Sequence, residues 1–422
     1  MANNFDSNFV TKLAKIFLDK FESARVLSKR VNTQLLTGKF DPDSGTLTQF
    51  KRPTDYTSTR TADGDVSALA AKPIITGKAT GTVQDYFTVM VEFAAVDQAL
   101  KMGQLPELLA PIATRLATDL ETDFAAFMLK NAGLSFGSPD TSVTTWQHVA
   151  DAGALMQSLG IPSGDPWTYA MNPFTQAILA NTNRALGSPI QGAVKTALEQ
   201  AKLLQNFAGM DVIAASTLAS LTTKAISDRA GTLTAAPDPT YVTAKDTMKQ
   251  TWAVTAFTAS LEIQAGEIIE VTGKFRLNLN TRKIFLDGAG DPLKYRAVVT
   301  EAVTLGSSGE GNIVVAGPAI FESDGAYNTV DAALASSDVV TLLGTASTTY
   351  QPNMFFHRNA FAIGSVPQEK LFSTDTLATT EDGLQIRVSK FADGLANVNR
   401  MRFDLLPAYA VLNPFFAGQG FA

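Results

Sequence analysis

The chain has 422 residues, a length that allows about two or three domains. Charged residues make up 18% of it, against roughly 25% in an average soluble protein, and its net charge of -6 excludes the strongly basic balance of a nucleic-acid binder. The absence of cysteine excludes disulfides, thiolate nucleophiles and zinc–cysteine sites. No signal peptide is recognisable, and no uncharged apolar run approaches the ~20 residues of a membrane helix. We therefore expect a soluble protein made in the cytoplasm. The low fraction of charged residues suggests that other subunits cover much of its surface, as in an assembly.

Residues 7–35 are predicted to form an amphipathic helical arm. Its apolar residues recur at helical spacing, and charged residues occupy most other positions. The apolar set is Phe9, Val10, Leu13, Ile16, Phe17 and Phe21. Such a helix either packs on its own domain or docks on a partner, and the pattern leaves both possibilities open.

A long β-hairpin arm is predicted next. The β-like run GTLTQFKRP ends at Pro53, and a polar stretch with Gly and Pro extends from Thr54 to Gly81, before the strand-like run TVQDYFTVMVEFAAV. A connection of this length is uncommon inside a compact domain. Because it has few large apolar residues, it is either disordered or an extended hairpin that lies on another surface.

Residues 105–133, LPELLAPIATRLATDLETDFAAFMLKNAG, are predicted to form one long amphipathic helix. Apolar side chains lie at successive i+4 steps from Leu108 to Met128, and Gly133 is placed to end the helix. A kink or a restart is expected at Pro111, which removes one backbone hydrogen bond. A solvated face, mainly off the apolar stripe, is expected for the acidic residues Glu107, Asp119, Glu121 and Asp123.

An α+β domain with an all-β insertion is predicted for the rest of the chain. From 145 to 221, helical runs alternate with short strand-like runs. From 222 to about 349, short runs rich in Thr, Val and Ile are separated by Gly and Asp turns, which indicates a barrel or a sandwich. The mixed pattern then resumes, so the β unit is inserted. A C-terminal hairpin turns at Asp393-Gly394, and Arg400 and Arg402 are expected to pair with carboxylates across the strands.

No catalytic, cofactor or metal motif is complete. The runs TGKATG and GEGNIV lack residues of a phosphate loop and of a dinucleotide fingerprint, and FDPDSG lacks most of a calcium loop. The two histidines, His148 and His357, have no motif partner. A triad could still assemble from distant residues, but catalysis is not expected. The residues alone predict a large oligomeric α+β protein without a cofactor or metal.

The order of these elements resembles that of the major capsid protein of tailed double-stranded DNA bacteriophages, which has the Hong Kong 97 (Johnson) fold. The stretches that carry the resemblance are KRPTDYTSTR with GKATG, LAPIATRLATDLETDFAAFML, NFAGMDVIAAS and KFADGLANVNRMRFDLLPAYAVLNP. The insertion makes the chain similar to coat proteins of the short-tailed-phage branch, which carry a telokin-like insertion domain. The resemblance implies an α+β fold with an N-arm, an extended loop, a spine helix, peripheral and axial domains, and an inserted all-β barrel.

The resemblance also implies domain boundaries. They are an N-terminal arm at 1–36, a peripheral domain at 37–144 with its extended loop at about 46–92 and spine helix at about 105–132, an axial domain at 145–221 and 347–395, an inserted barrel at 222–346, and C-terminal peripheral strands at 396–422.

By this resemblance the chain is a structural, non-enzymatic subunit of an icosahedral virion capsid, assembled as hexamers and pentamers in the host bacterial cytoplasm. Scaffolding protein is expected in trans, with a procapsid that later expands. A portal protein and double-stranded DNA, enclosed without sequence-specific binding, are further expected partners, and no membrane is involved. The main alternative is an encapsulin-like cellular shell, which would normally lack the insertion. The second alternative is a carbohydrate-active or carbohydrate-binding protein with a β accessory domain.

Three sets of contact residues are expected. The insertion loop between Pro237 and Gln250 would reach a neighbouring capsomer, with a solvated turn as the alternative, and its candidates are Asp238, Tyr241, Lys245, Asp246 and Lys249. The extended loop would contact an adjacent subunit through Lys51, Arg52, Arg60 and Asp63. The N-terminal arm would bind scaffolding protein through Asp6, Asp19 and Glu22.

Overall fold

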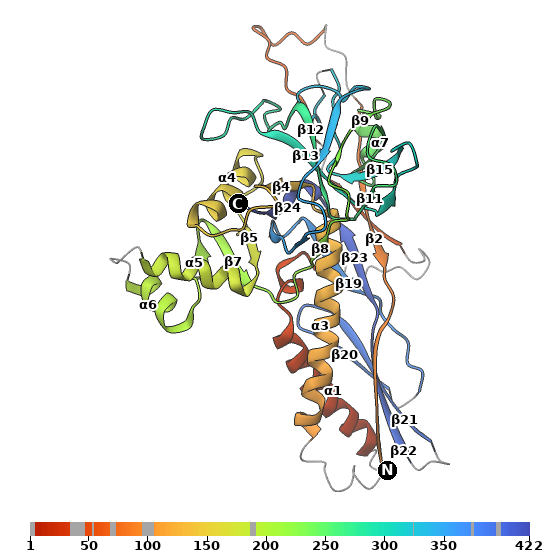
Figure 1. Ribbon diagram of the computed structural model, residues 1–422. Helices are drawn as coiled ribbons and strands as arrows, with labels where there is room; N and C mark the ends of the chain where they lie inside the picture. Colours follow the sequence, from red (N-terminus) through yellow and green to blue (C-terminus); the bar gives the residue numbers. More distant parts are fainter. Residues whose placement is uncertain are drawn as a thin grey trace. The chain divides into compact units, whose positions relative to one another are not determined.

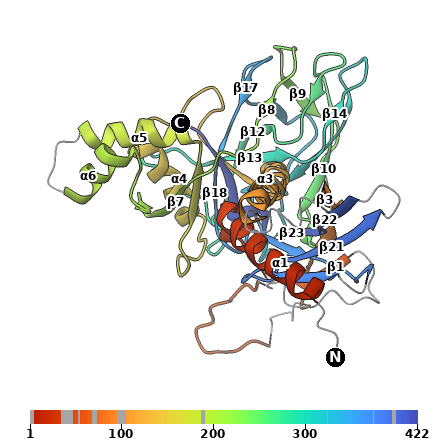
Figure 2. The same ribbon diagram turned by 90° about the horizontal axis from the view of Figure 1, so that it is seen from below.

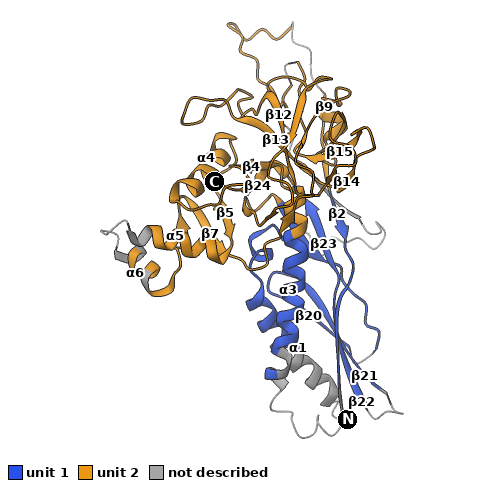
Figure 3. Cartoon of the chain, in the orientation of Figure 1, with its two compact units in different colours: residues 1–49, 80–125, 361–411 blue, residues 50–79, 126–360, 412–422 orange. Residues whose placement is uncertain are grey.

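The computed structural model has a mixed α+β fold (Figure 1) that divides into two compact units (Figure 3). Unit 1 comprises residues 1–49, 80–125 and 361–411, and unit 2 comprises residues 50–79, 126–360 and 412–422. The structure describes residues 5–33, 47–52, 55–67, 73–94, 105–185, 191–323, 325–372, 375–393 and 398–422. The turn predicted at Asp393-Gly394 therefore falls partly outside the described residues.

Unit 1 combines antiparallel sheets with helix α1 (Phe5–Ala24) and most of helix α3 (Leu105–Asn131). The helix α1, the red helix in Figure 2, contacts strands β20 and β21, and the ring of Phe17 stacks on that of Phe403 at 4.5 Å. The sheet orders are β20–β21–β22–β3 and β1–β2–β23–β19. The bounds are β1 Leu47–Lys51, β2 Lys78–Val83, β3 Phe87–Ala94, β19 Phe361–Ser365, β20 Thr376–Thr379, β21 Gln385–Asp393, β22 Val398–Leu405 and β23 Pro407–Val411.

The N-terminal helix ends at Ala24, so the helix predicted over 7–35 is too long. Beyond it, the backbone N–H groups of Leu27 and Ser28 donate to the carboxylate of Glu121, at 2.6 and 3.0 Å. These amides find their acceptor on a distant segment rather than along a continued helix. The end of α1 is thus set by a tertiary contact, which helical periodicity does not report.

The spine helix α3 continues through Pro111, so no restart occurs there. Pro111 is exposed and is the seventh residue of α3, past the first turn, so the helix lacks one internal backbone hydrogen bond there. The predicted apolar stripe is confirmed by the buried residues Leu116, Leu120, Phe124 and Met128. The helix is therefore continuous past the proline.

The mixed part of unit 2 packs helices α4 (Trp146–Ser158), α5 (Pro173–Ala185) and α6 (Gln191–Gln200) with a sheet of order β4–β24–β18–β5–β7–β6. The pairs β5–β7 and β24–β4 are parallel, and the other pairs are antiparallel. The bounds are β4 Leu134–Phe136, β5 Thr168–Met171, β6 Asn206–Phe207, β7 Met210–Ala214, β18 Asn353–Phe356 and β24 Ala417–Gly420. The helices and strands predicted over 145–221 are present.

The insertion is a closed barrel of order β10–β15–β13–β12–β16–β9. Trp252, Tyr295 and Ile313 are fully buried in its core. The bounds are β9 Ala230–Leu233, β10 Lys249–Thr255, β12 Ile268–Phe275, β13 Lys294–Val299, β15 Gly311–Ala316 and β16 Val339–Leu342, with the short helix α7 (Tyr241–Ala244) between β9 and β10. The expected α+β class with an inserted all-β barrel is confirmed.

The chain enters and leaves the barrel side by side. Strand β8 (Leu221–Thr222) pairs antiparallel with β17 (Thr349–Tyr350), and the hydroxyls of Thr222 and Thr349 lie 2.9 Å apart. This short ladder returns the chain to the sheet that it left. An insertion of more than a hundred residues can thus be accommodated without displacing that sheet.

Candidate assembly contacts

The insertion loop before β10 is folded on itself. The carboxylate of Asp238 accepts hydrogen bonds from the Thr243 hydroxyl, at 2.6 Å, and from the Thr240 backbone N–H, at 2.9 Å. These bonds lower the pKa of Asp238, the Thr243 hydroxyl having the largest effect. Asp238 is exposed and lies just before helix α7, whose N-cap residue is Thr240. The loop is therefore a preformed surface feature of the subunit.

The other charged residues of this loop already have partners within the chain. The Lys245 ammonium lies 2.7 Å from the Asp246 carboxylate, and Lys249 lies 3.5 Å from Glu301. Hydrogen bonding to Lys245, with smaller effects from the Lys78 backbone, lowers the pKa of Asp246. Lys245, Asp246 and Lys249 are half-buried. Their charges are balanced in the subunit, but their side chains still reach solvent.

Tyr241 is placed differently from its charged neighbours. Its side chain is only 3% exposed, and its ring stacks face to face on Tyr327, with centroids 3.6 Å apart. Burial raises the pKa of its hydroxyl. We therefore assign Tyr241 to the interior of the subunit rather than to a surface contact.

The candidates in the extended loop also separate into two groups. Lys51, Arg60 and Asp63 are exposed. Arg52 is 6% exposed, donates its backbone N–H to the Gly77 carbonyl at 2.8 Å, and directs its guanidinium to the Leu412 carbonyl. Burial lowers the pKa of Arg52 to about 10. Arg52 therefore makes its contacts within its own subunit.

The acidic residues of the N-terminal arm lie on α1. Asp19 is exposed, and Glu22 is half-buried and accepts the backbone N–H of Glu381 at 2.7 Å. The backbone of Asp6 belongs to α1, but its side chain lies outside the described part of the structure. Asp19 is thus the candidate with the most accessible described carboxylate.

The solvated face predicted for the spine helix is wrong at one position. Glu121 is 1% exposed, and its carboxylate accepts the backbone N–H groups of Leu27 and Ser28 and the Ser28 hydroxyl. Glu107 and Asp123 are exposed, and Asp119 pairs with Arg115 at 3.0 Å. A signal was available in the sequence, since Ala113, Ala117 and Ala125 continue a second apolar ridge through position 121, and all three are buried.

The predicted cross-strand pairing with a carboxylate is present for Arg400, whereas Arg402 pairs with a carboxylate of its own strand β22. Arg400 reaches Glu92 at 2.7 Å, across the β22–β3 pair in which these residues are register partners. Arg402 and Arg387 both reach Asp404, each at 2.6 Å, and Asp404 is fully buried. These contacts join β3, β21 and β22 into one sheet.

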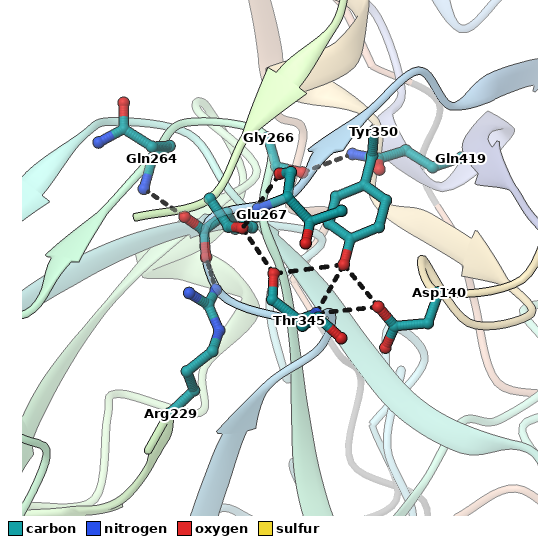
Figure 4. Close-up of polar contacts among 10 residues, drawn as sticks. Asp140, Arg229, Gln264, Gly266, Glu267, Thr345, Tyr350 and Gln419 are labelled. Atoms are coloured by element: carbon teal, nitrogen blue, oxygen red, sulfur yellow. Dashed lines mark hydrogen bonds and ion pairs between the residues drawn. The ribbon is translucent and has the colours of Figure 1, made fainter. Parts of the chain in front are cut away.

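A polar network at the base of the barrel was not predicted. The buried side chains of Arg229 and Glu267 form an ion pair, and Gln264 donates its backbone N–H to Glu267 at 2.8 Å (Figure 4). Burial raises the pKa of Glu267, and Arg229 opposes that shift. The side-chain amide of Gln419 donates to the Gly266 carbonyl at 2.8 Å, which connects the barrel to the C-terminal strand β24.

The same region contains a second carboxylate contact. The Tyr350 hydroxyl donates to Asp140 at 2.5 Å, and the Thr345 backbone N–H donates to the same oxygen at 2.9 Å (Figure 4). Hydrogen bonding to Tyr350 is the main cause that lowers the pKa of Asp140. These hydrogen bonds connect the segment around Asp140 to the end of the insertion.

Neither histidine belongs to a catalytic grouping in the described structure. His148 Nδ1 accepts the Thr144 backbone N–H at 3.3 Å, and His357 Nδ1 accepts the Asn359 backbone N–H at 3.1 Å. Burial lowers the pKa of His357. Among the described residues, no group of three or more histidine, aspartate or glutamate side chains could hold a metal ion. No helix in the described parts of the chain is long and apolar enough to cross a membrane.

The chain is similar to several known proteins of bacteriophages. The major capsid protein of Acyrthosiphon pisum secondary endosymbiont phage 1 is 37% identical to the chain over 424 residues, covering 100% of this chain and 99% of that protein. A solved chain from Mycobacterium phage Che8 has a TM-score of 0.46 and 11% identity, covering 94% of this chain and 90% of its own. A chain from the capsid structure of cyanophage P-SCSP1u has a TM-score of 0.44 and 12% identity, with coverages of 90% and 84%.

The full-length identity to a major capsid protein shows that the chain is a structural shell protein. The family described as P22 coat protein, gene protein 5, matches residues 1–422, and the chain belongs to this family. It is therefore a phage major capsid protein, part of the virion and assembled from copies of itself, as the resemblance implied. These relatives give no support to the encapsulin or carbohydrate-binding alternatives.

Proposed function

We propose that the chain forms, with scaffolding protein in trans, a procapsid of hexamers and pentamers that expands when double-stranded DNA is packaged. The shell receives a portal protein, encloses the DNA without sequence-specific contacts, and is assembled in the host cytoplasm. The chain contributes no catalytic activity. The observation that carries this proposal is the 37% identity, over the whole chain, to a protein named as a major capsid protein.

In this proposal the charged residues of the insertion loop form the contact between capsomers. Asp238, Lys245, Asp246 and Lys249 reach solvent, and their present partners belong to the same chain. A partly exposed ion pair contributes only ~0–1 kcal/mol, so these charges can exchange partners at little cost. A closed shell repeats the contact at every equivalent position. Small individual contributions can therefore determine whether the shell closes.

The exposed residues of the extended loop contact an adjacent copy of the chain. Lys51, Arg60 and Asp63 supply the charges, and the neighbouring side chains of Tyr56 and Val66 are more than half exposed. Apolar side chains of this size gain free energy when a partner covers them. A second copy is the partner that a shell supplies.

The acidic side of the N-terminal arm binds scaffolding protein through Asp6, Asp19 and Glu22. The test is to substitute all three with alanine and to measure co-sedimentation of scaffolding protein with the coat. A matched control replaces the exposed acids Asp85, Glu107 and Glu310, which changes the net charge equally. Weaker binding for the first variant alone, most clearly at low salt, supports the assignment. Equal binding by both variants contradicts it.

Electron microscopy of negatively stained protein, expressed with and without scaffolding protein, tests the proposal as a whole. Closed shells of uniform size are expected with scaffolding protein, and irregular or differently sized particles without it. A stable monomer under both conditions, or uniform shells in the absence of scaffolding protein, would contradict the proposal.

A further inference from the structure

The root of the extended loop is held by the insertion of the same chain. The outgoing limb passes Asp55, and the returning limb passes Ile75 and Gly77 and enters strand β2 at Lys78. Both limbs belong to unit 2, as does the barrel, and the loop is the orange-red segment that extends beyond the barrel in Figure 1. Each limb is bonded to residues of the insertion.

The hydroxyl of Tyr327 joins the two limbs. It accepts the backbone N–H of Asp55 at 2.9 Å and donates to the carbonyl of Ile75 at 3.1 Å. Its ring is fixed by the face-to-face stack on Tyr241, with an interplanar angle of 1°. A single side chain of the insertion therefore sets the separation of the outgoing and returning limbs.

Arg282 adds a second attachment to the outgoing limb. One guanidinium nitrogen lies 2.5 Å from the Asp55 carboxylate, and another donates to the Asn328 carbonyl at 2.8 Å. Arg282 has a φ of 55°, a backbone conformation that non-glycine residues seldom adopt. This conformation places the guanidinium between the loop and the segment that carries Tyr327.

The returning limb is attached to the proposed inter-capsomer loop. The backbone N–H of Lys78 donates to the Asp246 carboxylate at 3.1 Å. At Gly77 the two segments are so close that a Cβ atom would lie 2.4 Å from the Lys245 carbonyl oxygen, so only glycine fits. The residues proposed to contact the next capsomer thus also hold the extended loop.

We infer that Tyr327, Arg282 and Asp246 are positioning residues that fix the direction of the extended loop, so that the insertion determines where the loop meets a neighbouring copy of the chain. The inference rests on the proposed function, in which the extended loop lies on an adjacent subunit. According to this inference, the insertion loop and the extended loop are attached to each other and move together. A change in either contact is then transmitted to the other.

The first test measures hydrogen exchange in the full-length, unassembled subunit. Tyr327→Phe removes the bridging hydroxyl and keeps the stacked ring. Peptides that contain the Asp55 amide should exchange about five- to tenfold faster, because that amide loses its acceptor. The matched control is Tyr86→Phe, which removes the hydroxyl of an exposed tyrosine in unit 1. Exchange equal to that of the unaltered protein in Tyr327→Phe would overturn the inference.

A double-mutant cycle tests the attachment by Arg282. Asp55→Asn and Arg282→Gln should each accelerate exchange in the loop, and the double variant should be no faster than the faster single variant. Lys283→Gln is the matched control, because it removes the adjacent exposed positive charge. Additive effects of the two substitutions, or an equal effect of the control, would overturn the role of Arg282.

Assembly of the same variants separates this inference from the proposed function. Tyr327→Phe should yield misformed shells or tubes under conditions in which the unaltered protein and Tyr86→Phe yield closed shells. If loop exchange is faster but the variant shells are normal, the attachment exists without positioning the loop, and the inference fails while the proposed function stands. If the unaltered protein forms no shells, the proposed function fails.

Discussion

At the residue scale, the buried carboxylate of Glu121 shows how an acidic residue of a surface helix can become internal. Glu121→Ala leaves the Leu27 and Ser28 amides without their acceptor, and we expect the free energy of unfolding to fall by about 2–4 kcal/mol. Glu107→Ala, in the same helix but exposed, should change it by less than about 1 kcal/mol. Chemical denaturation of both variants is the measurement. Equal losses would contradict the role of the buried contact, because the exposed Glu107 lacks it.

The hydrogen bonds of Asp140 predict how the stability of the protein changes with pH. Its pKa in the folded state is lowered from the ordinary value of 3.8, mainly by the hydrogen bond from Tyr350. The contact with Tyr350 and Thr345 is therefore fully stabilising above pH 3.8 and is lost as the pH falls through the lower folded-state value. Thermal unfolding followed from neutral to acidic pH should show this loss. In Asp140→Asn the acid-dependent decrease should be smaller, and an identical pH profile would contradict the assignment.

At the element scale, the turn before β15 depends on a glycine. Gly309 has a φ of 71°, and a Cβ atom there would lie 1.8 Å from the Phe257 carbonyl oxygen. Gly309→Ala should destabilise the protein by about 2 kcal/mol or more. Gly288→Ala is the matched control, since an added Cβ atom would meet open space. Comparable unfolding midpoints for the two variants would contradict this account of the turn.

The charged loop before β10 gives an assembly prediction at the same scale. Asp246→Ala removes the partner of Lys245 and the acceptor of the Lys78 amide, and Lys245→Ala removes the cation alone. Both variants should remain folded, because partly exposed ion pairs contribute little to stability. Both should form tubes or aberrant shells, which microscopy would reveal. Normal shells at the normal rate from both variants would count against the inter-capsomer role.

Periodicity predicted the elements whose pattern is long, and failed where a distant partner decides the structure. The helices α3, α4 and α5 were predicted because their apolar residues repeat over many turns. Strand β9 was not predicted, because AGTL is too short to show alternation. The early end of α1 and the burial of Glu121 both depend on the hydrogen bond between Leu27 and Glu121, which are 94 residues apart in the sequence. The hydrogen bond between Gln419 and Gly266 could not be predicted from local sequence either, because the two residues are separated by 153 positions.

At the scale of the whole molecule, the exposed extended loop and the half-buried insertion loop are attached to each other within one subunit. The proposed contact with an adjacent subunit predicts that loop residues 56–67 are more protected from hydrogen exchange in the shell than in the unassembled subunit, because a neighbouring copy covers them in the shell. Peptides from the barrel core, such as those containing Trp252 and Ile313, are already buried and should exchange equally in both states. Equal protection of the loop in both states would contradict the proposed contact.

A cryo-electron microscopy reconstruction of the assembled shell, at a resolution that shows side chains, tests the central claim most directly. The account predicts that Asp238, Lys245, Asp246 and Lys249 lie at the boundary between capsomers and that the extended loop lies on an adjacent subunit. It also predicts that Tyr327 still bridges Asp55 and Ile75 within each subunit. Insertion loops that face solvent on every capsomer, or extended loops detached from their own insertions, would contradict it.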